Sequence, residues 1–223
     1  MIDVILCDDH ALIRRGIRDT LSDASDIRVI GEVGDYGELR TLMRNLAAEP
    51  GRDNARAGCC DVLVLDINLP GRSGLDVLHV LKDEGSAVKV LVVSMYPEDQ
   101  YAIRALRAGA YGYVNKGGDP QLLVQAVRTV AQGRKYVTAE IAQMLVESLT
   151  TPSSENPHSK LSDRELQTLV MIASGKRLAD IAEELTLSPK TVSVYRARVL
   201  EKLQLANNSE LTVYAIRNGL VGQ

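Results

Sequence analysis

The sequence predicts a doubly wound α/β domain, built on a five-stranded parallel sheet, followed by a smaller all-α domain of four helices. Three observations lead to this prediction. Short β-branched apolar runs alternate with amphipathic stretches along residues 1–134, a Pro- and Ser-containing stretch comes later, and only helical patterns follow it. Strands that alternate with helices are typical of right-handed βαβ units in a parallel sheet.

The five strands are predicted from apolar runs that show no polar alternation. Such runs suit strands buried on both faces of a parallel sheet. The runs cover residues 4–7, 27–33, 62–65, 88–93 and 111–114. The amphipathic stretches predicted as helices between and after them are 11–21, 36–46, 75–81, 99–108 and 121–130.

Residues 135–160 are predicted to link the two domains, with one helix at 139–149. The stretch 150–160 contains two Pro and three Ser without an apolar period, which indicates an exposed hinge. The second domain, 161–223, has helical patterns at 162–173, 177–185, 189–202 and 209–218. Ser162 and Glu165 have the spacing of a capping box, and Gly175 and Gly219 fit helix ends.

The composition is that of an ordinary globular protein. Of the 223 residues, 45% are hydrophobic and 25% are charged, and the net charge is −3. This balance excludes a wholly disordered or collagen-like chain. No apolar run approaches the roughly 20 residues of a membrane-spanning helix, and the start MIDVILCDDH turns acidic where a secretion signal is basic. We therefore expect a cytoplasmic protein with no membrane partner.

Polar residues gather where the predicted strands end. Asp8 and Asp9 follow the first strand, Asp66 ends the third, Ser94 follows the fourth and Lys116 follows the fifth. In a parallel sheet these ends meet at one edge, where ligands bind. Three adjacent carboxylates repel one another unless a cation joins them, and a hard dication such as Mg²⁺ suits oxygen ligands. The cluster can therefore hold a phosphoryl group on Asp66 as nucleophile, with Ser94 and Lys116 on its oxygens.

The segment 177–203, RLADIAEELTLSPKTVSVYRARVLEKL, contains a helix, a break at 186–188 and a second helix. Apolar residues of both helices can form a shared core. Cations and hydroxyls on the outer face suit DNA phosphates, with short side chains near base edges. From charge alone, a solvated basic face on a protein-binding domain is an open alternative. The outer-face residues are Lys190, Thr191, Ser193, Arg196 and Arg198.

Residues 1–134 resemble the receiver domain of a two-component response regulator, a flavodoxin-like or CheY-like fold. The matching residues are the pair Asp8-Asp9, the acceptor position Asp66, the hydroxyl of Ser94, and Lys116. The loops at Pro70-Gly71 and Lys116-Gly117 fit the same family. The resemblance implies that a sensor histidine kinase phosphorylates Asp66.

The resemblance also implies a metal site and a switch. The Mg²⁺ ligands would come from the acidic pair Asp8 and Asp9, from Asp66 and from the backbone carbonyl of Asn68. Ser94 would move onto the phosphoryl oxygen, and the aromatic switch residue Tyr113 would turn inward behind it. The physical cause would be the added charge of about −1.5 to −2.

Residues 161–219 resemble the LuxR-type helix-turn-helix domain of the NarL/FixJ response regulators. The matching motifs are LSDREL, ASGK, IAEELTLSPKTVSVYRARVLEKL and NSELTVYAIRNGL. The resemblance implies that double-stranded DNA is the partner and that the last helix, around 211–216, pairs with its twin in a DNA-bound homodimer. The implied base-facing residues are Ser193, Val194 and Ala197, and the implied phosphate contacts are Lys190, Thr191, Arg196, Arg198 and Lys202.

The sequence thus predicts a transcription regulator that phosphorylation of Asp66 activates, and not an enzyme. Phosphorylation would favour a homodimer, in which two linked DNA-binding units gain affinity by avidity. Without it, the receiver either covers the recognition helix or fails to dimerise, and the sequence leaves both open. It also leaves open the cognate kinase, the operator, activation against repression, and the receiver face that dimerises.

The sequence supports alternative functions less well. A haloacid-dehalogenase-type phosphatase needs a second acid two residues after the nucleophile, where this chain has Asn68. A flavin-binding domain of this topology needs a phosphate-cradling loop, and the first loop here is DDH. A receiver that signals through protein contacts alone and a stand-alone aspartyl phosphatase are the remaining rivals.

Three features depart from the family pattern. Met95 is bulkier than the residue expected after Ser94, which predicts slow hydrolysis of the phosphoryl group unless Met95 simply fills the core. The segment 47–60, between the second predicted helix and the third predicted strand, is longer than expected and is interpreted as a surface insertion. The neighbouring Cys59 and Cys60 could report redox state, but the residues on either side of the pair, Gly58 and Asp61, are not basic.

Overall fold

The computed structural model describes residues 1–48, 59–96, 98–150 and 157–221. The chain divides into two compact units, Met1–Val146 and Glu147–Gln223, and each is described by itself. Across the described ranges, every helix is too short or too polar to cross a membrane.

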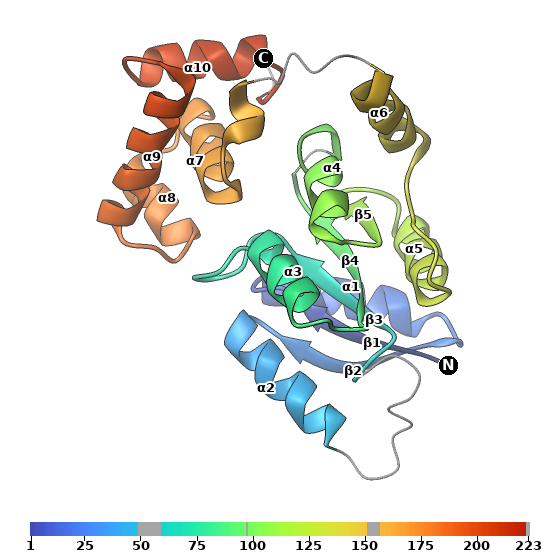
Figure 1. Cartoon of the computed structure of the whole chain (residues 1–223). Helices are drawn as coiled ribbons and strands as arrows, with labels where there is room; N and C mark the ends of the chain where they lie inside the picture. The colour runs from blue at the N-terminus through green and yellow to red at the C-terminus, as the bar shows by residue number, and fades with distance from the viewer. Residues whose placement is uncertain (49–58, 97, 151–156, 222–223) are drawn as a thin grey trace. The chain divides into compact units, whose positions relative to one another are not determined.

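The first unit contains a five-stranded parallel sheet with the order β2-β1-β3-β4-β5 (Figure 1). All five residues of β3 are buried, as expected for a strand covered on both faces. The predicted doubly wound fold is confirmed, and each strand lies within two residues of its predicted position. The strands are β1 Ile2–Cys7, β2 Ile27–Val33, β3 Val62–Asp66, β4 Lys89–Ser94 and β5 Gly112–Asn115.

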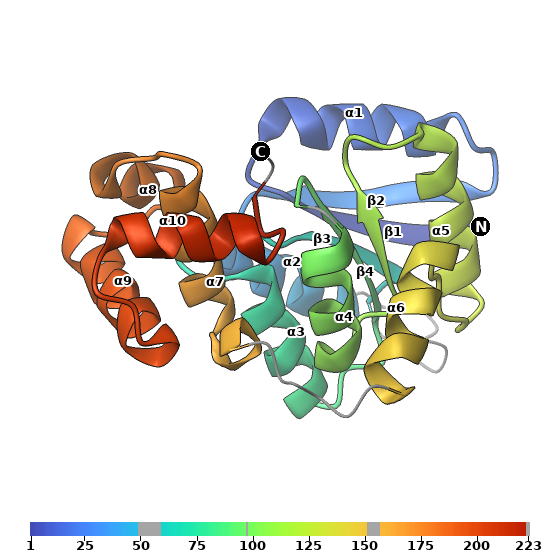
Figure 2. The same ribbon diagram turned by 90° about the horizontal axis from the view of Figure 1, so that it is seen from above.

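Helices cover both faces of this sheet, α1 and α5 on one and α2, α3 and α4 on the other (Figure 2). Alternate strand residues divide between the faces: Val4 and Val64 pack with the buried Leu21 and Val127 on the α1 and α5 side. Because all five strands are parallel, their carboxyl ends lie at one edge of the sheet. The helices are α1 Ala11–Ser22, α2 Tyr36–Ala47, α3 Gly74–Asp83, α4 Glu98–Ala108 and α5 Pro120–Ala131.

The chain that leaves α5 stays on the first unit. Tyr136 forms a parallel bridge with Gly112 of β5, and the Thr138 hydroxyl donates to Glu98 Oε2 of α4 at 2.9 Å. Helix α6, Ala139–Thr150, follows at the predicted place, and its Ile141 is fully buried. The first unit therefore continues past residue 134, and the domain limits drawn from the sequence stay a prediction.

The second unit is helical, and its four predicted helices are present. The capping box is confirmed, since Ser162 Oγ accepts from the Glu165 N–H and Glu165 Oε2 accepts from the Ser162 N–H. Gly175 and Gly219 have φ of 85° and 66° directly after two of the helices, which is the backbone that glycine adopts most easily. The helices are α7 Asp163–Ala173, α8 Leu178–Glu184, α9 Pro189–Leu203 and α10 Asn208–Arg217.

One element was not predicted. A 3-10 turn, η1, forms at Pro157–Lys160, within the stretch interpreted as an exposed hinge. The Nδ1 of His158 lies 2.9 Å from the hydroxyl of Tyr214 in α10, and the two rings meet edge to face. The turn is thus held by a contact with a distant helix, while residues 151–156 of the hinge lie outside the described residues.

Candidate functional site

An acidic pocket lies at the carboxyl ends of β1, β3 and β5. The ammonium nitrogen of Lys116 is 2.7 Å from Asp8 Oδ2 and 2.8 Å from Asp66 Oδ2. The three side chains are only 3–5% exposed. The structure therefore brings together three of the residues that the strand-end rule placed at this edge.

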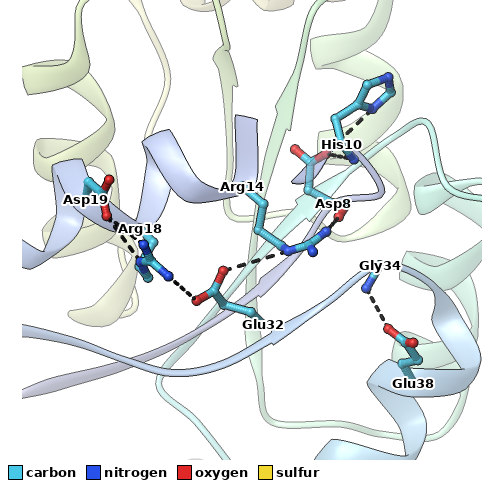
Figure 3. A network of polar contacts seen from close by, with 8 residues as sticks. All are labelled: Asp8, His10, Arg14, Arg18, Asp19, Glu32, Gly34 and Glu38. Carbon is cyan, nitrogen blue, oxygen red and sulfur yellow. Dashed lines mark hydrogen bonds and ion pairs between the residues drawn. The ribbon is translucent and has the colours of Figure 1, made fainter. Parts of the chain in front are cut away.

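Asp9 and His10 form the more open side of the pocket. His10 Nδ1 lies 2.5 Å from Asp9 Oδ1, and the His10 backbone N–H donates to Asp8 Oδ1 at 2.8 Å (Figure 3). One ligand atom from each of Asp8, Asp9, His10 and Asp66 lies within 4.8 Å of the others. The turn after β1 thus points two carboxylates towards Asp66.

The electrostatics of the pocket act on Asp66. Burial raises the pKa of its carboxyl from 3.8 to about 6, although the ammonium of Lys116 opposes the change. The negative charge of Asp8 raises this pKa further, and a hydrogen bond from the Asn68 backbone N–H lowers it. Since burial dominates, charged Asp66 is held in a costly environment that another cation would relieve.

The residues present fit a divalent cation. Three carboxylates face a single buried ammonium. Within the described part of the chain, Asp8 Oδ2 and Asp9 Oδ1 are buried and receive no hydrogen bond of good geometry, although the Lys116 ammonium and the His10 imidazole lie close to them. Oxygen ligands and excess negative charge are what Mg²⁺ requires.

Ser94 and Tyr113 lie beside the pocket. Ser94 is 1% exposed, and its hydroxyl accepts from the Tyr96 N–H at 3.3 Å. The hydroxyl of the fully buried Tyr113 donates to the Tyr96 backbone carbonyl at 2.7 Å. Burial raises the pKa of Tyr113 well above its usual value. Tyr113 therefore already points inward in this structure.

Tyr96 belongs to the same site and is not among the residues predicted from the sequence. Its hydroxyl donates to Asn68 Oδ1 at 3.3 Å, and its ring stacks on Tyr101 of α4 with centroids 4.6 Å apart. An aromatic residue in the loop after β4 was the available signal. Met95, the preceding residue of this loop, is 62% exposed, so the alternative that it fills the core is wrong.

Gly74 fixes the loop that follows Asp66. A Cβ at Gly74 would lie 2.0 Å from the backbone oxygen of Asp66, and the Gly74 N–H donates to the Ile67 carbonyl at 2.8 Å. Only glycine permits this close approach of α3 to the end of β3. The position of Asp66 thus depends on a residue that no chemical motif reveals.

The first unit also contains three cysteines. Cys7, Cys59 and Cys60 are buried and form no disulfide with one another, and burial raises the pKa of the Cys7 thiol far above its usual value. Most of the interpreted insertion, residues 49–58, lies outside the described residues.

The second candidate site is the outer face of α9. Val192, Val199 and Leu203 are buried on the inner face of this helix, as the predicted shared core requires. The outer face borders a hollow of about 370 Å³, lined in part by Lys190, Val194 and Arg198. Thr191 and Arg196 are half-buried, and the predicted DNA-binding residues that are exposed are Lys190, Ser193, Val194, Ala197, Arg198 and Lys202.

Two of the predicted DNA-binding cations have partners within the protein. Arg196 Nε donates to Asn208 Oδ1 at 2.6 Å, and Lys202 Nζ donates to Glu165 Oε2 at 2.7 Å. Burial of Glu165 opposes its ionisation, but hydrogen bonds from Lys202 and Ser162 outweigh this and lower its pKa. The ammonium of Lys202 thus joins the end of α9 to the start of α7.

Comparisons with known proteins agree with both halves of this description. The family model of the response regulator receiver domain matches residues 4–128. The model of the luxR family of bacterial regulatory proteins matches residues 159–215. The response regulator UvrY of Escherichia coli is 38% identical over 221 residues, covering 99% of this chain and 96% of UvrY. The response regulator GacA of Pseudomonas protegens is also 38% identical over 221 residues, covering 99% and 98%.

Solved structures give the same result. RcsB of Salmonella enterica serovar Typhimurium, bound to promoter rprA in the presence of the phosphomimetic BeF3−, matches with a TM-score of 0.62 and 25% identity over 96% of this chain and 97% of that chain. A LuxR-family two-component response regulator from Aurantimonas matches with a TM-score of 0.57 and 30% identity, covering 68% and 99%. The chain therefore belongs to the NarL/FixJ-type response regulators, and it is a DNA-binding transcription regulator with a receiver domain and a LuxR-type helix-turn-helix domain.

Proposed function

We propose that Asp66 is the phospho-acceptor of this regulator and that its phosphorylation controls DNA binding by α9. The observation that carries the proposal is the position of Lys116, which joins Asp8 and Asp66 in a buried pocket at the strand ends. A fixed cation beside a buried carboxylate is suited to binding the phosphoryl oxygens that arrive with the donor.

The chemistry is nucleophilic displacement at phosphorus. An oxygen of Asp66 forms the new O–P bond while the bond to the donor breaks, and the leaving group keeps that electron pair. Lys116 neutralises charge on the phosphoryl oxygens, and the Ser94 hydroxyl donates to another oxygen once it leaves the Tyr96 N–H. Movement of Ser94 would shift the backbone at Tyr96. Because the Tyr96 carbonyl accepts from the Tyr113 hydroxyl, this shift would reach Tyr113.

Magnesium belongs to the same proposal. Asp8, Asp9, Asp66 and the backbone carbonyl of Asn68 would hold the ion. When bound, Mg²⁺ supplies positive charge that lowers the repulsion between the incoming phosphoryl group and the carboxylates. The crowded carboxylates and the raised pKa of Asp66 support this assignment.

On DNA, we assign α9 to the major groove. Ser193, Val194 and Ala197 would face base edges, because they are exposed and short. Lys190, Thr191, Arg196 and Arg198 would bind phosphates. Lys202 already binds Glu165, so we assign its first role to the structure of the domain.

The partners follow from this assignment. A sensor histidine kinase would supply the phosphoryl group, and a homodimer would bind paired half-sites through α10, whose Val213 and Ile216 are 47% and 42% exposed. The protein would work in the cytoplasm, where kinase and DNA meet. The promoter complex of RcsB, formed with a phosphomimetic, is the precedent for this proposal.

Phosphorylation by a small donor tests the site. The protein is incubated with acetyl phosphate and Mg²⁺, and covalent phosphate is read by intact mass. We expect one phosphoryl group per chain, none with Asp66→Asn, and normal labelling with Asp76→Asn, because Asp76 is an exposed residue of α3. Labelling that persists in Asp66→Asn would exclude Asp66, and continuous turnover of a phosphoester would favour an aspartyl phosphatase.

A further inference from the structure

Arg14 of α1 reaches back to the loop that carries the acidic pair. Its backbone N–H donates to the His10 carbonyl at 2.9 Å, in the first turn of the helix. Its guanidinium Nη1 donates to the backbone carbonyl of Asp8 (Figure 3). One residue thus fixes the turn from Asp8 to His10 from two sides.

Glu32 of β2 orients this guanidinium. Glu32 Oε2 lies 3.7 Å from Arg14 Nε, and Glu32 Oε1 lies 3.3 Å from Arg18 Nη1. Arg18 also binds Asp19 at 3.0 Å, so the two arginines hold Glu32 between them (Figure 3). The side chains of Arg14 and Glu32 are 21% and 30% exposed, so this contact is partly shielded from solvent, unlike a surface ion pair.

The next residue has no such role. The side chain of Arg15 is 72% exposed, and its ion pair at 3.9 Å is with Asp19, which is 60% exposed, so this contact lies in solvent. Arg14 and Arg15 therefore carry the same charge on the same helix in different environments. This pair provides a matched comparison.

The carbonyl that Arg14 holds belongs to the residue whose carboxylate enters the pocket. Asp8 presents Oδ2 to Lys116 and Oδ1 to the His10 N–H. The hydrogen bond from Arg14 therefore restrains the backbone from which the carboxylates of Asp8 and Asp9 project. The positive charge of Arg14 is met by Glu32, so its main effect on a cation in the pocket is geometric and not repulsive.

We propose that Arg14, oriented by Glu32, is a positioning residue that holds the Asp8–Asp9 turn in the geometry that binds the divalent cation. The inference rests on the proposed Mg²⁺ site and names a residue outside it. Groups that orient metal ligands change metal affinity by about 10- to 100-fold when they are removed. Arg14 acts one step further away, through the Asp8 backbone, so we expect an effect near the lower end of this range.

A calorimetric titration with Mg²⁺ alone, without a phosphodonor, tests the inference. We expect Arg14→Ala to raise the dissociation constant about tenfold or more, and Arg15→Ala to leave it within about twofold of the original. Arg14→Lys should give an intermediate value, since it keeps one donor but loses the fork. If Arg14→Ala folds poorly, Arg14→Lys and Glu32→Gln carry the test.

A purely structural role is separated by two readouts. Removing Arg14 for stability alone would lower the melting temperature and leave Mg²⁺ affinity in the folded protein unchanged, and this result would overturn the inference. Arg14→Ala should also raise the Mg²⁺ concentration for half-maximal phosphorylation while the rate at saturating Mg²⁺ stays the same. If the unmodified protein itself binds no Mg²⁺, the proposed function fails, whereas equal binding by Arg14→Ala refutes only the inference.

Discussion

The carboxylate of Asp66 lies 2.8 Å from the ammonium of Lys116, and both side chains are almost fully buried. A single ammonium cannot balance Asp66 and Asp8 together, because each carboxylate is removed from water. The pocket is therefore ready for more positive charge before any phosphoryl group arrives. This relationship explains how a small acidic site can take up a cation and a phosphoryl group in turn.

The first prediction concerns pH. The pKa of Asp66 is about 6 in the folded protein and 3.8 in its unperturbed state. Between these values the native state binds the extra proton, so the contribution of Asp66 to stability is fully present below pH 3.8 and is lost as pH rises through 6. Without metal, the loss amounts to about 3 kcal/mol.

Asp66→Asn isolates this effect. In EDTA, the free energy of unfolding of Asp66→Asn relative to the unmodified protein should grow by about 3 kcal/mol from low to neutral pH. Added Mg²⁺ should restore the stability of the unmodified protein at neutral pH, because the ion binds the native state. If the free energies of unfolding of the two proteins changed with pH in parallel, Asp66 would not have a raised pKa in the folded protein.

The second prediction concerns Gly74. Alanine there would place Cβ 2.0 Å from the Asp66 carbonyl oxygen, a backbone atom that cannot rotate away. We expect Gly74→Ala to lower the free energy of unfolding by about 1–3 kcal/mol and to slow phosphorylation. Gly16 of α1 is the control, since its Cβ would meet nothing within 4 Å, and alanine should stabilise the helix by about 0.5–1 kcal/mol. Equal effects of the two changes in chemical denaturation would contradict this account.

The third prediction separates two cations of α9. Arg198 is exposed, whereas Lys202 binds the buried Glu165. Arg198→Ala should reduce the slope of log affinity against log salt by about 1, as expected for one lost phosphate contact. Lys202→Met should instead lower stability by about 1–3 kcal/mol, because Glu165 loses its cation.

Fluorescence anisotropy with a duplex from the promoter beside its own gene measures the salt slope, and thermal unfolding measures the stability. A normal melting temperature together with a reduced salt slope for Lys202→Met would instead make Lys202 a DNA contact.

The strands and the strand-end residues could be predicted because local pattern determines them. Buried parallel strands are unbroken apolar runs, so β4 was expected at 88–93 and lies at Lys89–Ser94. Once five such strands are parallel, Asp8, Asp66 and Lys116 must meet. The same holds for α9, where Pro189 after the capping Ser188 marks the start.

The missing parts depend on contacts between segments far apart in the chain. The 3-10 turn at Pro157–Lys160 is held by Tyr214, 56 residues after His158. The ion pair of Lys202 with Glu165 of α7 could not be predicted either, because a basic helix face has the same local pattern with and without such a partner, and the DNA contact of Lys202 stays a prediction. The role of Arg14 depends on where β2 places Glu32, which no helix periodicity reveals.

The central claim is that phosphorylation of Asp66 changes the affinity with which α9 binds DNA. The direct test is the affinity for the promoter duplex with acetyl phosphate and Mg²⁺ present or absent, for the unmodified protein and Asp66→Asn. We predict that affinity rises about tenfold or more for the unmodified protein, through two linked DNA-binding units, and stays constant for Asp66→Asn. An equal response of both proteins, or no response while Asp66 is fully labelled, would contradict the claim.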